Sequence, residues 1–302
     1  MSIGTISAPA FRRRAWFARM PWFSFLLLLP AVALMAIFFL VPIANAVYLS
    51  LTNQELAGPN AVHWSFIGLK NYNRMLSDPF LTNAIWKTVI YVGVSAIIGS
   101  TAVGMVLALL RERAVPWLGT LVSSLVIVAW VIPEIGAAII WTSFAQSGGS
   151  LDALLPGNAS TNWLAVAPMT ILCLANIWRG AAFSMLIFSA GLRNISAEVK
   201  EAAVLDGASG WEVLTLVVLP LLKSTIVTNF ILVTIGNLSD FTLIFALTHG
   251  GPGNATQTLA LYTYQQAFVF YELGYGTAVA VLLVVLGAIA SFIYVRVLRA
   301  EI

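Results

Sequence analysis

The stretch Met20–Gln54 decides the class of fold, because its sequence, MPWFSFLLLLPAVALMAIFFLVPIANAVYLSLTNQ, contains no charged residue. A helix needs about 20 apolar residues to cross about 30 Å of hydrocarbon, and this stretch is long enough. A cleaved secretory signal is the alternative, since arginines precede the stretch and Ala44-Asn45-Ala46 resembles a cleavage site. The apolar run Pro21–Ile43 is longer than the ~7–15 residues of a signal-peptide core, so we predict a retained membrane-spanning helix.

The composition of the whole chain agrees with a membrane protein. Of its 302 residues, 60% are hydrophobic and 9% are charged, and the mean hydropathy is +0.93. A soluble domain averages about 25% charged residues. A soluble enzyme, a nucleic-acid-binding protein and a disordered chain are therefore excluded. The single cysteine, Cys173, permits no internal disulfide, and the two histidines, His63 and His249, argue against a histidine-based metal site.

Five further segments are long and apolar enough to span a membrane. Transmembrane strands are the alternative, but barrel strands are about 10 residues long with alternating polarity. The runs Phe25–Leu29 and Val279–Leu286 do not alternate. We therefore predict an all-α polytopic membrane protein with six transmembrane helices. After the first, the predicted spans lie near Ala84–Leu110, Trp117–Phe144, Leu164–Ala190, Leu222–Leu247 and Leu273–Leu298.

The distribution of lysine and arginine predicts how the chain is oriented in the membrane. One side carries only Lys70, Arg74 and Lys87. Cytoplasmic loops carry an excess of basic residues, so the richer side is predicted to be cytoplasmic, with both termini there. The basic residues of that side are Arg12, Arg13, Arg14, Arg19, Arg111, Arg113, Arg193, Lys200, Lys223, Arg296 and Arg299.

The predicted cytoplasmic loop Gly191–Leu221 is long for a link between two spans, and its pattern predicts two short helices. Ser196 is placed to cap the first helix, and Gly207 offers the left-handed conformation that ends it. Ser209 and Glu212 have the spacing of a capping box that starts the second helix. The apolar side of the first helix either docks into a groove of a partner or rests on lipid headgroups, and the pattern leaves both open.

The loop contains Glu201, two alanines directly after it, an acidic-glycine-alanine corner that begins at Asp206, and the pair Leu219-Pro220. In these residues and their spacing it resembles the EAA loop of permease subunits of bacterial ABC importers. A second set of segments resembles the carbohydrate-uptake branch, and within it the MalF type rather than the MalG type: Leu247–Pro252, Tyr262–Tyr264 and Gly274–Ala278. The residues matching the EAA motif are Glu201, Ala202, Ala203, Asp206, Gly207, Ala208 and Pro220.

The resemblance implies a function and a set of partners. It implies the type I transmembrane fold of ABC importers in the bacterial inner membrane, a second, MalG-type permease, two ATPase subunits that grip the EAA loops, and an external substrate-binding protein. Glu201 would be the ionic anchor to the ATPase. ATP and Mg²⁺ would bind the partner subunits, and no cofactor would bind this chain. The chain has no Gly-x-x-x-x-Gly-Lys-Ser/Thr loop, so it is expected not to be an enzyme.

The resemblance extends from about Phe25 to near the C-terminus. It also implies how the chain is divided. The expected divisions are a cytoplasmic tail at residues 1–20, the first transmembrane helix with a periplasmic loop at 21–83, and an ABC type-1 transmembrane core at 84–298 that contains the coupling loop 191–221.

Polar residues inside the predicted spans are candidates for the transport path, because ionisable groups in a membrane usually face a cavity or a partner. Asn237 and Asp240 lie three residues apart in the fifth predicted span, so they would share a helix face. In MalF-type relatives the matching positions line the sugar site. The alternative role is an interhelical hydrogen bond that holds the bundle together.

Two other predicted spans also carry charge, at Arg179 and at Glu134. Positions matching Arg179, Gly180 and Phe183 touch sugar in the maltose subunit, and Phe183 could stack on a pyranose ring. Arg179 replaces an apolar residue there, and it could bind an anionic group of the substrate through its bidentate fork. The alternative is an ion pair of Arg179 with Asp240 or Glu134.

Two rival functions come from other classes. An ion-coupled secondary transporter would need no ATPase and would show internal repeats; the EAA-like loop argues against it. An intramembrane enzyme would need a converging catalytic set, and no serine–histidine or paired-aspartate motif occurs within the predicted spans. We therefore predict the permease subunit of an ATP-driven, binding-protein-dependent importer of a sugar or sugar derivative.

Overall fold

Helices account for the fold of residues 22–154 and 160–299, the part of the chain that the computed structural model describes. Within this part there is no β-strand, only an isolated β-bridge between Thr52 and Phe66. The prediction of an all-α fold is therefore confirmed. The predicted tail at residues 1–20 lies outside the described residues. The chain divides into two units, one ending at Tyr48 and one beginning at Leu49.

The first unit is built by one apolar helix, which runs on to Ser50. Helix α1 (Trp22–Met35), a π-helical segment (Ala36–Leu40) and helix α2 (Val41–Ser50) follow one another without a break. Residues Leu28–Ser50 are long and apolar enough to cross a membrane. The side chain of Phe38 is 68% exposed, and its apolar neighbours are exposed in the same way. Such an all-round apolar helix is suited to lipid rather than water.

The second unit contains three long helices that can each cross a membrane. The first combines α5 (Pro79–Ile90), a π-helical segment (Tyr91–Ser100) and α6 (Thr101–Arg113). The other two are α11 (Pro168–Arg193) and α18 (Leu273–Arg299). Together with the helix of the first unit, they correspond to the predicted first, second, fourth and sixth spans.

The remaining two predicted spans are broken. Helices α7 (Pro116–Val131) and α8 (Glu134–Ala145) meet at 102°, where Pro133 lacks a backbone N–H and disfavours helix in the residue before it. The segment 210–221 and helix α15 (Lys223–Leu238) meet at 66°. The described residues thus contain four spans, or up to six when each bent pair is counted as one.

The prediction of a continuous fifth span, Leu222–Leu247, is wrong. Helix α15 ends at Leu238, and α16 (Thr242–Thr248) starts only after a break of three residues. In this break the hydroxyl of Ser239 donates hydrogen bonds to the carbonyls of Ile235 and Gly236. Short polar side chains that bond to the nearby backbone in this way compete with the helical pattern.

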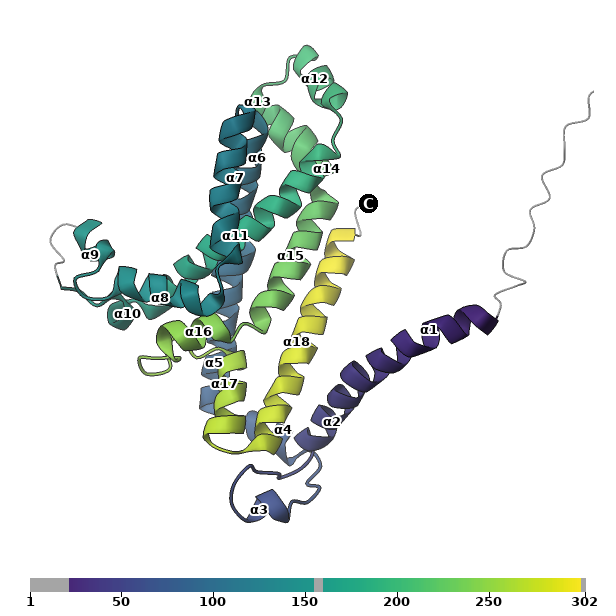
Figure 1. Ribbon diagram of the computed structural model, residues 1–302, viewed down its shortest axis with the longest axis vertical. Coiled ribbons are helices and arrows are strands. Elements are labelled where there is room, and N and C mark those ends of the chain that lie inside the picture. The colour runs from purple at the N-terminus through teal and green to yellow at the C-terminus, as the bar shows by residue number, and fades with distance from the viewer. Residues whose placement is uncertain (1–21, 155–159, 300–302) are drawn as a thin grey trace, which may run out of the picture. The chain divides into compact units, whose positions relative to one another are not determined.

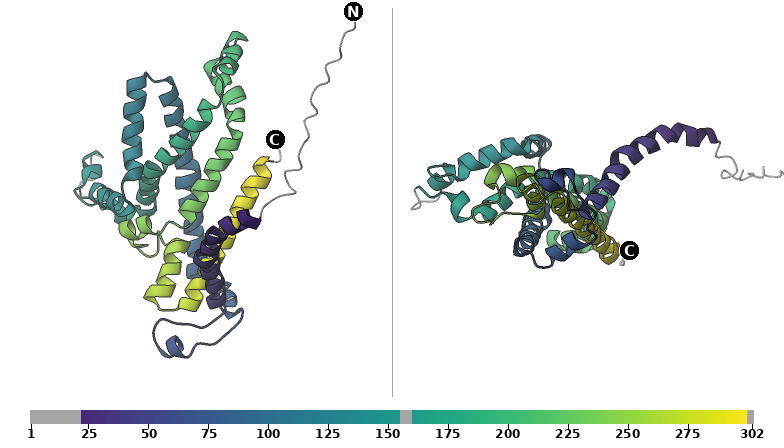
Figure 2. Two further views of the ribbon diagram at one scale, coloured as in Figure 1. Left: turned by 45° about the vertical axis from the view of Figure 1, so that its right-hand side comes forward. Right: turned by 90° about the horizontal axis from the view of Figure 1, so that it is seen from below.

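Short helices connect the spans. Figures 1 and 2 show α12 and α13 at one end of the second unit, the end where α6 meets α7, and α3 and α4 at the opposite end. The end with α12 also carries the basic residues Arg111, Arg113 and Arg193 in the last turns of α6 and α11. The short helices are α3 (Pro59–Val62), α4 (Lys70–Met75), α9 (Ser150–Leu154), α10 (Trp163–Val166), α12 (Ala197–Leu205), α13 (Gly210–Glu212), α14 (Leu219–Leu221) and α17 (Leu259–Tyr264), with π-helical segments at Val213–Val218 and Gln265–Val269.

Helix α11 is the centre of the second unit, and small residues let α6 approach it closely. A Cβ added at Gly104 would lie 2.4 Å from the Cβ of Ser184 on α11. One turn earlier along both helices, a Cβ added at Gly180 on α11 would lie 2.4 Å from the hydroxyl of Ser100, the residue just before α6. Close backbone approach of this kind is how helices associate in lipid, where no hydrophobic force drives them together.

At the end that holds α4, Asp78 joins three helices. Its carboxylate caps the first turn of α5 and accepts hydrogen bonds from the hydroxyls of Tyr262 and Tyr275, on α17 and α18. Burial disfavours the charged carboxylate, but these hydrogen bonds outweigh it and hold the pKa of Asp78 below its ordinary value. Beside it, Arg74 pairs with Glu272 at 2.7 Å.

Candidate functional site

A cavity of about 400 Å³ lies where the two broken segments meet α11. Polar and aromatic side chains from α7, α8, α11, α15 and the break after α15 line it. All the path residues singled out from the sequence are among them. These residues are Glu134, Arg179, Gly180, Phe183, Asn237 and Asp240.

The helix breaks place the two acidic residues of the cavity. Glu134 is the first residue of α8, directly after the bend at Pro133. Asp240 lies in the break between α15 and α16, so it does not share a helical face with Asn237 through a continuous helix, as the spacing had predicted. Arg179, by contrast, lies in the middle of the unbroken α11, with Phe183 one turn further on.

Arg179 and Glu134 form an ion pair across the cavity, with Nη1 of the arginine 3.4 Å from Oε1 of the glutamate. The arginine side chain is only 14% exposed, and that of the glutamate is 36% exposed. The glutamate places a negative charge beside the guanidinium, which offsets part of the cost of burying it. The Nε atom of Arg179 nevertheless has no hydrogen-bond partner.

Asp240 has one satisfied and one unsatisfied oxygen. The hydroxyl of Tyr91, which is fully buried, donates a hydrogen bond to Oδ2. Oδ1 is buried and has no partner. A buried acceptor without a donor is costly, and such a group in a cavity is placed to receive a donor from a ligand or from water.

Asn237 is bound within the protein. Its Oδ1 accepts a hydrogen bond from Nδ2 of Asn176 on α11 at 2.6 Å, and its own Nδ2 donates to the carbonyl of Val233 at 2.7 Å. Asn176 donates a second bond, to the hydroxyl of Ser95 at 2.7 Å. The side chain of Asn237 therefore makes the interhelical hydrogen bond that was its alternative role.

Aromatic rings form one wall of the cavity. The rings of Phe183 and Trp130 lie 5.8 Å apart and tilted, and Phe241 also lines the space. Sequence reasoning missed Trp130, because nothing local separates it from the tryptophans of membrane interfaces. It also missed Asn176, although its position three residues before Arg179 puts both on one face of α11.

Gly180 both lines the cavity and lets the helices approach. Because a side chain there would collide with Ser100, its small size is first of all a packing requirement. Within residues 22–154 and 160–299, no three histidine, cysteine or acidic side chains gather as a metal site would need.

The loop 191–221 has the predicted form of two helices and a corner. Helix α12 ends at Leu205, Gly207 has a φ of 89°, and Ser209 and Glu212 make the predicted capping box. The predicted cap at Ser196 is absent, since its side chain makes no capping bond. Lys200 pairs with Glu112 of α6.

The residues matching the EAA motif are mostly exposed. Glu201, Ala202, Asp206 and Gly207 are exposed, Ala203 and Ala208 are half-buried, and Pro220 lies in the short α14. The neighbouring side chain of Leu205 is 88% exposed. These two helices and the corner between them form one end of the second unit (Figure 1), and apolar and acidic side chains of α12 are exposed there.

Several apolar spans around a polar cavity between broken helices define a membrane transport protein. Residues 100–301 match the model of one family, described as the binding-protein-dependent transport system inner membrane component. The chain belongs to this family, and it is a transmembrane permease subunit of an ABC importer. The alternative of an ion-coupled secondary transporter is not supported.

Two curated relatives extend the match over nearly the whole chain. The sulfoquinovosyl glycerol transport system permease protein SmoG of Agrobacterium fabrum is 33% identical, with 91% of this chain and 90% of the relative covered. The trehalose/maltose transport system permease protein MalF of Thermococcus litoralis is 31% identical, with 91% and 93% covered.

The fold is also that of a solved importer. A chain from a bacterial ABC transporter that imports the acidic polysaccharide alginate superposes with a TM-score of 0.79 at 20% identity. The superposition covers 92% of this chain and 96% of the other. The expected type I transmembrane fold of ABC importers is thus confirmed.

Proposed function

We propose that this permease carries a sugar or a sugar derivative through the cavity between α7, α8, α11 and α15. The transport systems of its relatives are named for sulfoquinovosyl glycerol and for trehalose and maltose, which supports a carbohydrate substrate. A second permease of the MalG type would complete the path, and a periplasmic or lipid-anchored binding protein would deliver the substrate.

The observation that carries the proposal is the pair of unsatisfied polar atoms in the cavity, beside an aromatic wall. Sugar hydroxyls need both donors and acceptors, and Nε of Arg179 and Oδ1 of Asp240 offer one of each. The rings of Phe183 and Trp130 provide the apolar surface on which a pyranose ring stacks. Asn237 acts behind this surface, by holding α15 to α11.

The energy for transport would come from two ATPase subunits that bind the loop 191–221. ATP and Mg²⁺ would bind those subunits and not this chain. Glu201 would be the ionic contact, and the corner at Asp206 and Gly207 would fit the cleft of the ATPase. A stiff two-helix element can pass on a movement that a flexible linker would absorb.

The orientation that fits this role places the loop and both termini in the cytoplasm of the cell, with the chain in the inner membrane. The clustering of Arg111, Arg113, Arg193 and Lys200 at the end with α12 supports this, because basic residues favour the cytoplasmic side.

Uptake by the reconstituted importer tests the proposal. Proteoliposomes with both permeases, the ATPase subunits and the binding protein are expected to take up a sugar only when ATP is inside. Uptake by this chain without ATPase subunits would contradict the proposal.

Uptake by Arg179→Ala then tests whether the substrate is anionic or neutral. If the guanidinium binds a substrate anion, uptake of a charged sugar derivative falls about tenfold or more, and uptake of the matched neutral sugar falls less. Glu134→Gln is the companion variant: it removes the ion pair but keeps the guanidinium, so a loss of charged-substrate uptake as large as that of Arg179→Ala would assign the effect to the ion pair. Equal losses for both substrates would mean that Arg179 serves only its ion pair with Glu134.

A further inference from the structure

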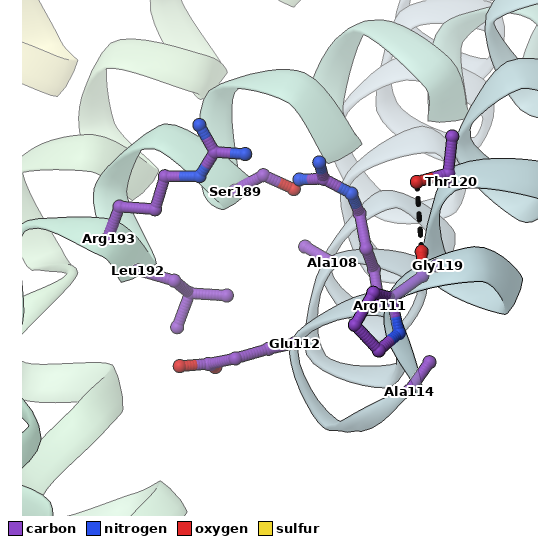
Figure 3. A pocket seen from close by; sticks show the side chains of 10 residues that line it. Ala108, Arg111, Glu112, Ala114, Gly119, Thr120, Ser189, Leu192 and Arg193 are labelled. Atoms are coloured by element: carbon purple, nitrogen blue, oxygen red, sulfur yellow. Dashed lines mark hydrogen bonds between the residues drawn. The ribbon is translucent and has the colours of Figure 1, made fainter.

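A second cavity, of about 320 Å³, lies at the end of the molecule that holds α12. It is open to the surface and is lined by the last turns of α6 and α11 and by the first turn of α7; Arg193 is exposed and Arg111 is half-buried. Figure 3 shows the side chains of Arg111 and Arg193 entering it from opposite sides, with Ser189 between them. None of its residues lines the cavity that contains Arg179.

The charge of this cavity is positive. Arg111 and Arg193 form no ion pair with any acidic side chain of the described residues. The one acidic residue of the lining, Glu112, pairs with Lys200 of α12, so its charge is already balanced. Two arginines therefore face one small space without a counterion.

A buried hydroxyl points into the same space. Ser189 is 7% exposed, and its Oγ has no hydrogen-bond partner. In Figure 3 this oxygen is directed towards the guanidinium of Arg111. The hydroxyl can both donate and accept, but no hydrogen bond joins it to either guanidinium, and a buried hydroxyl without a partner is costly. An acceptor placed between Ser189 and the two arginines would satisfy all three.

The first turn of α7 adds to the positive potential. This helix starts at Pro116, and the side chain of Val115 before it makes no capping bond. The N-terminus of a helix carries a partial positive charge, which attracts anions; the N–H of Gly119 itself already bonds to the carbonyl of Val115, and Pro116 has no N–H. Pro116, Gly119 and Thr120 of this helix line the cavity.

We propose that this cavity binds a phosphate group, with Arg111 and Arg193 as charged ligands and Ser189 as a hydroxyl donor. The surface beside it favours the headgroup of an acidic phospholipid over a free phosphate. Trp117 is 69% exposed and Leu110 is 60% exposed, so apolar side chains suited to acyl chains adjoin the basic site. Basic pockets between membrane helices bind such headgroups.

The experiment measures lipid retained by the assembled importer that contains the full chain. The complex is taken from membranes of phosphatidylglycerol and phosphatidylcholine, and bound lipid is counted by native mass spectrometry. We expect phosphatidylglycerol to be retained, and Arg111→Gln or Arg193→Gln to weaken it roughly fivefold each. Arg113→Gln, which removes the same charge from the same turn outside the cavity, is the control and should retain the lipid.

Two further arms identify the source of the phosphate and guard against misfolding. In phosphatidylcholine alone, inorganic phosphate that raises the melting temperature of the wild type but not of Arg111→Gln would assign the site to a free phosphate. Ser189→Ala keeps both charges and is expected to weaken retention by a smaller factor. Equal retention by the wild type and both arginine variants, with no effect of inorganic phosphate, would overturn the proposal whatever sugar the importer carries.

Discussion

The cavity that contains Arg179 and the loop 191–221 satisfy their polar groups in opposite ways. In the cavity, Arg179 pairs with Glu134, and Asp240 accepts a hydrogen bond from Tyr91. In the loop, Glu201 is exposed, and with it the apolar side chains of its own helix. The cavity satisfies most of its polar groups within one chain, whereas the loop leaves acidic and apolar groups exposed.

The surroundings of the two regions explain this difference. Inside a membrane no bulk water is present to satisfy a polar group, and each unsatisfied group costs several kcal/mol. The cavity therefore has few polar atoms without a hydrogen-bond partner, and the two that remain are Nε of Arg179 and Oδ1 of Asp240. At the membrane surface water satisfies exposed acids at little cost, so the loop can hold Glu201 ready for a partner.

The largest effect is expected in the loop, from Glu201→Ala. Truncating one partner of a buried, hydrogen-bonded interfacial charge pair costs about 2–5 kcal/mol, which corresponds to a weakening of the contact with the ATPase by about 30-fold or more and to a matching loss of coupled uptake. Reconstituted uptake and ATP hydrolysis measure it. Glu198→Ala removes the same charge one turn earlier on α12 and should have a smaller effect. Unchanged transport and hydrolysis in Glu201→Ala would contradict the proposal that the loop contacts the ATPase through Glu201.

A smaller effect is expected in the cavity wall, from Gly180→Ala. The added methyl would collide with Ser100, and overpacking of this kind costs about 1–3 kcal/mol. A lower melting temperature of the purified complex is the measurement. Gly236→Ala is the control, since a Cβ there meets no atom within 4 Å although Gly236 also lines the cavity. If both variants melt alike, close packing at Gly180 is not what holds the wall.

The smallest effect is expected at the corner of the loop, from Ser209→Ala. Loss of a capping side chain costs about 1 kcal/mol, and here it would loosen the start of α13. Faster hydrogen exchange at the start of the segment 210–221 is the expected signal. Ser196→Ala, at the start of α12, should change nothing, because Ser196 makes no capping bond. Equal changes in the two variants would count against a rigid corner.

Local patterns allowed the loop to be predicted well. The capping box needs only Ser209 and Glu212, three residues apart, and the turn at Gly207 needs only a glycine. Such contacts are decided by neighbours in the sequence. The missing cap at Ser196 shows the limit of this reasoning, since a suitable residue type does not guarantee the bond.

The cavity could be predicted only as a set of residues. The cost of charge in a membrane indicated Glu134, Arg179 and Asp240, and the structure brings them together. The ion pair of Arg179 with Glu134 was among the predicted alternatives. The partner of Asp240 could not be predicted, because Tyr91 is separated from it by 149 positions in the chain. The break after α15 was also missed, since apolar composition alone does not locate the end of a helix.

The central claim is that the loop 191–221 passes movement of the ATPase to the cavity, and the most direct test measures access to the cavity. Ser239 is exposed and lines the cavity, and Cys173, the only native cysteine, is buried. In Ser239→Cys, the rate at which a water-soluble thiol reagent labels the assembled importer reports access to the cavity. We predict that ATP and Mg²⁺ change this rate, and that the change disappears when Glu201→Ala is added. A rate that responds to ATP equally with and without Glu201 would contradict the account.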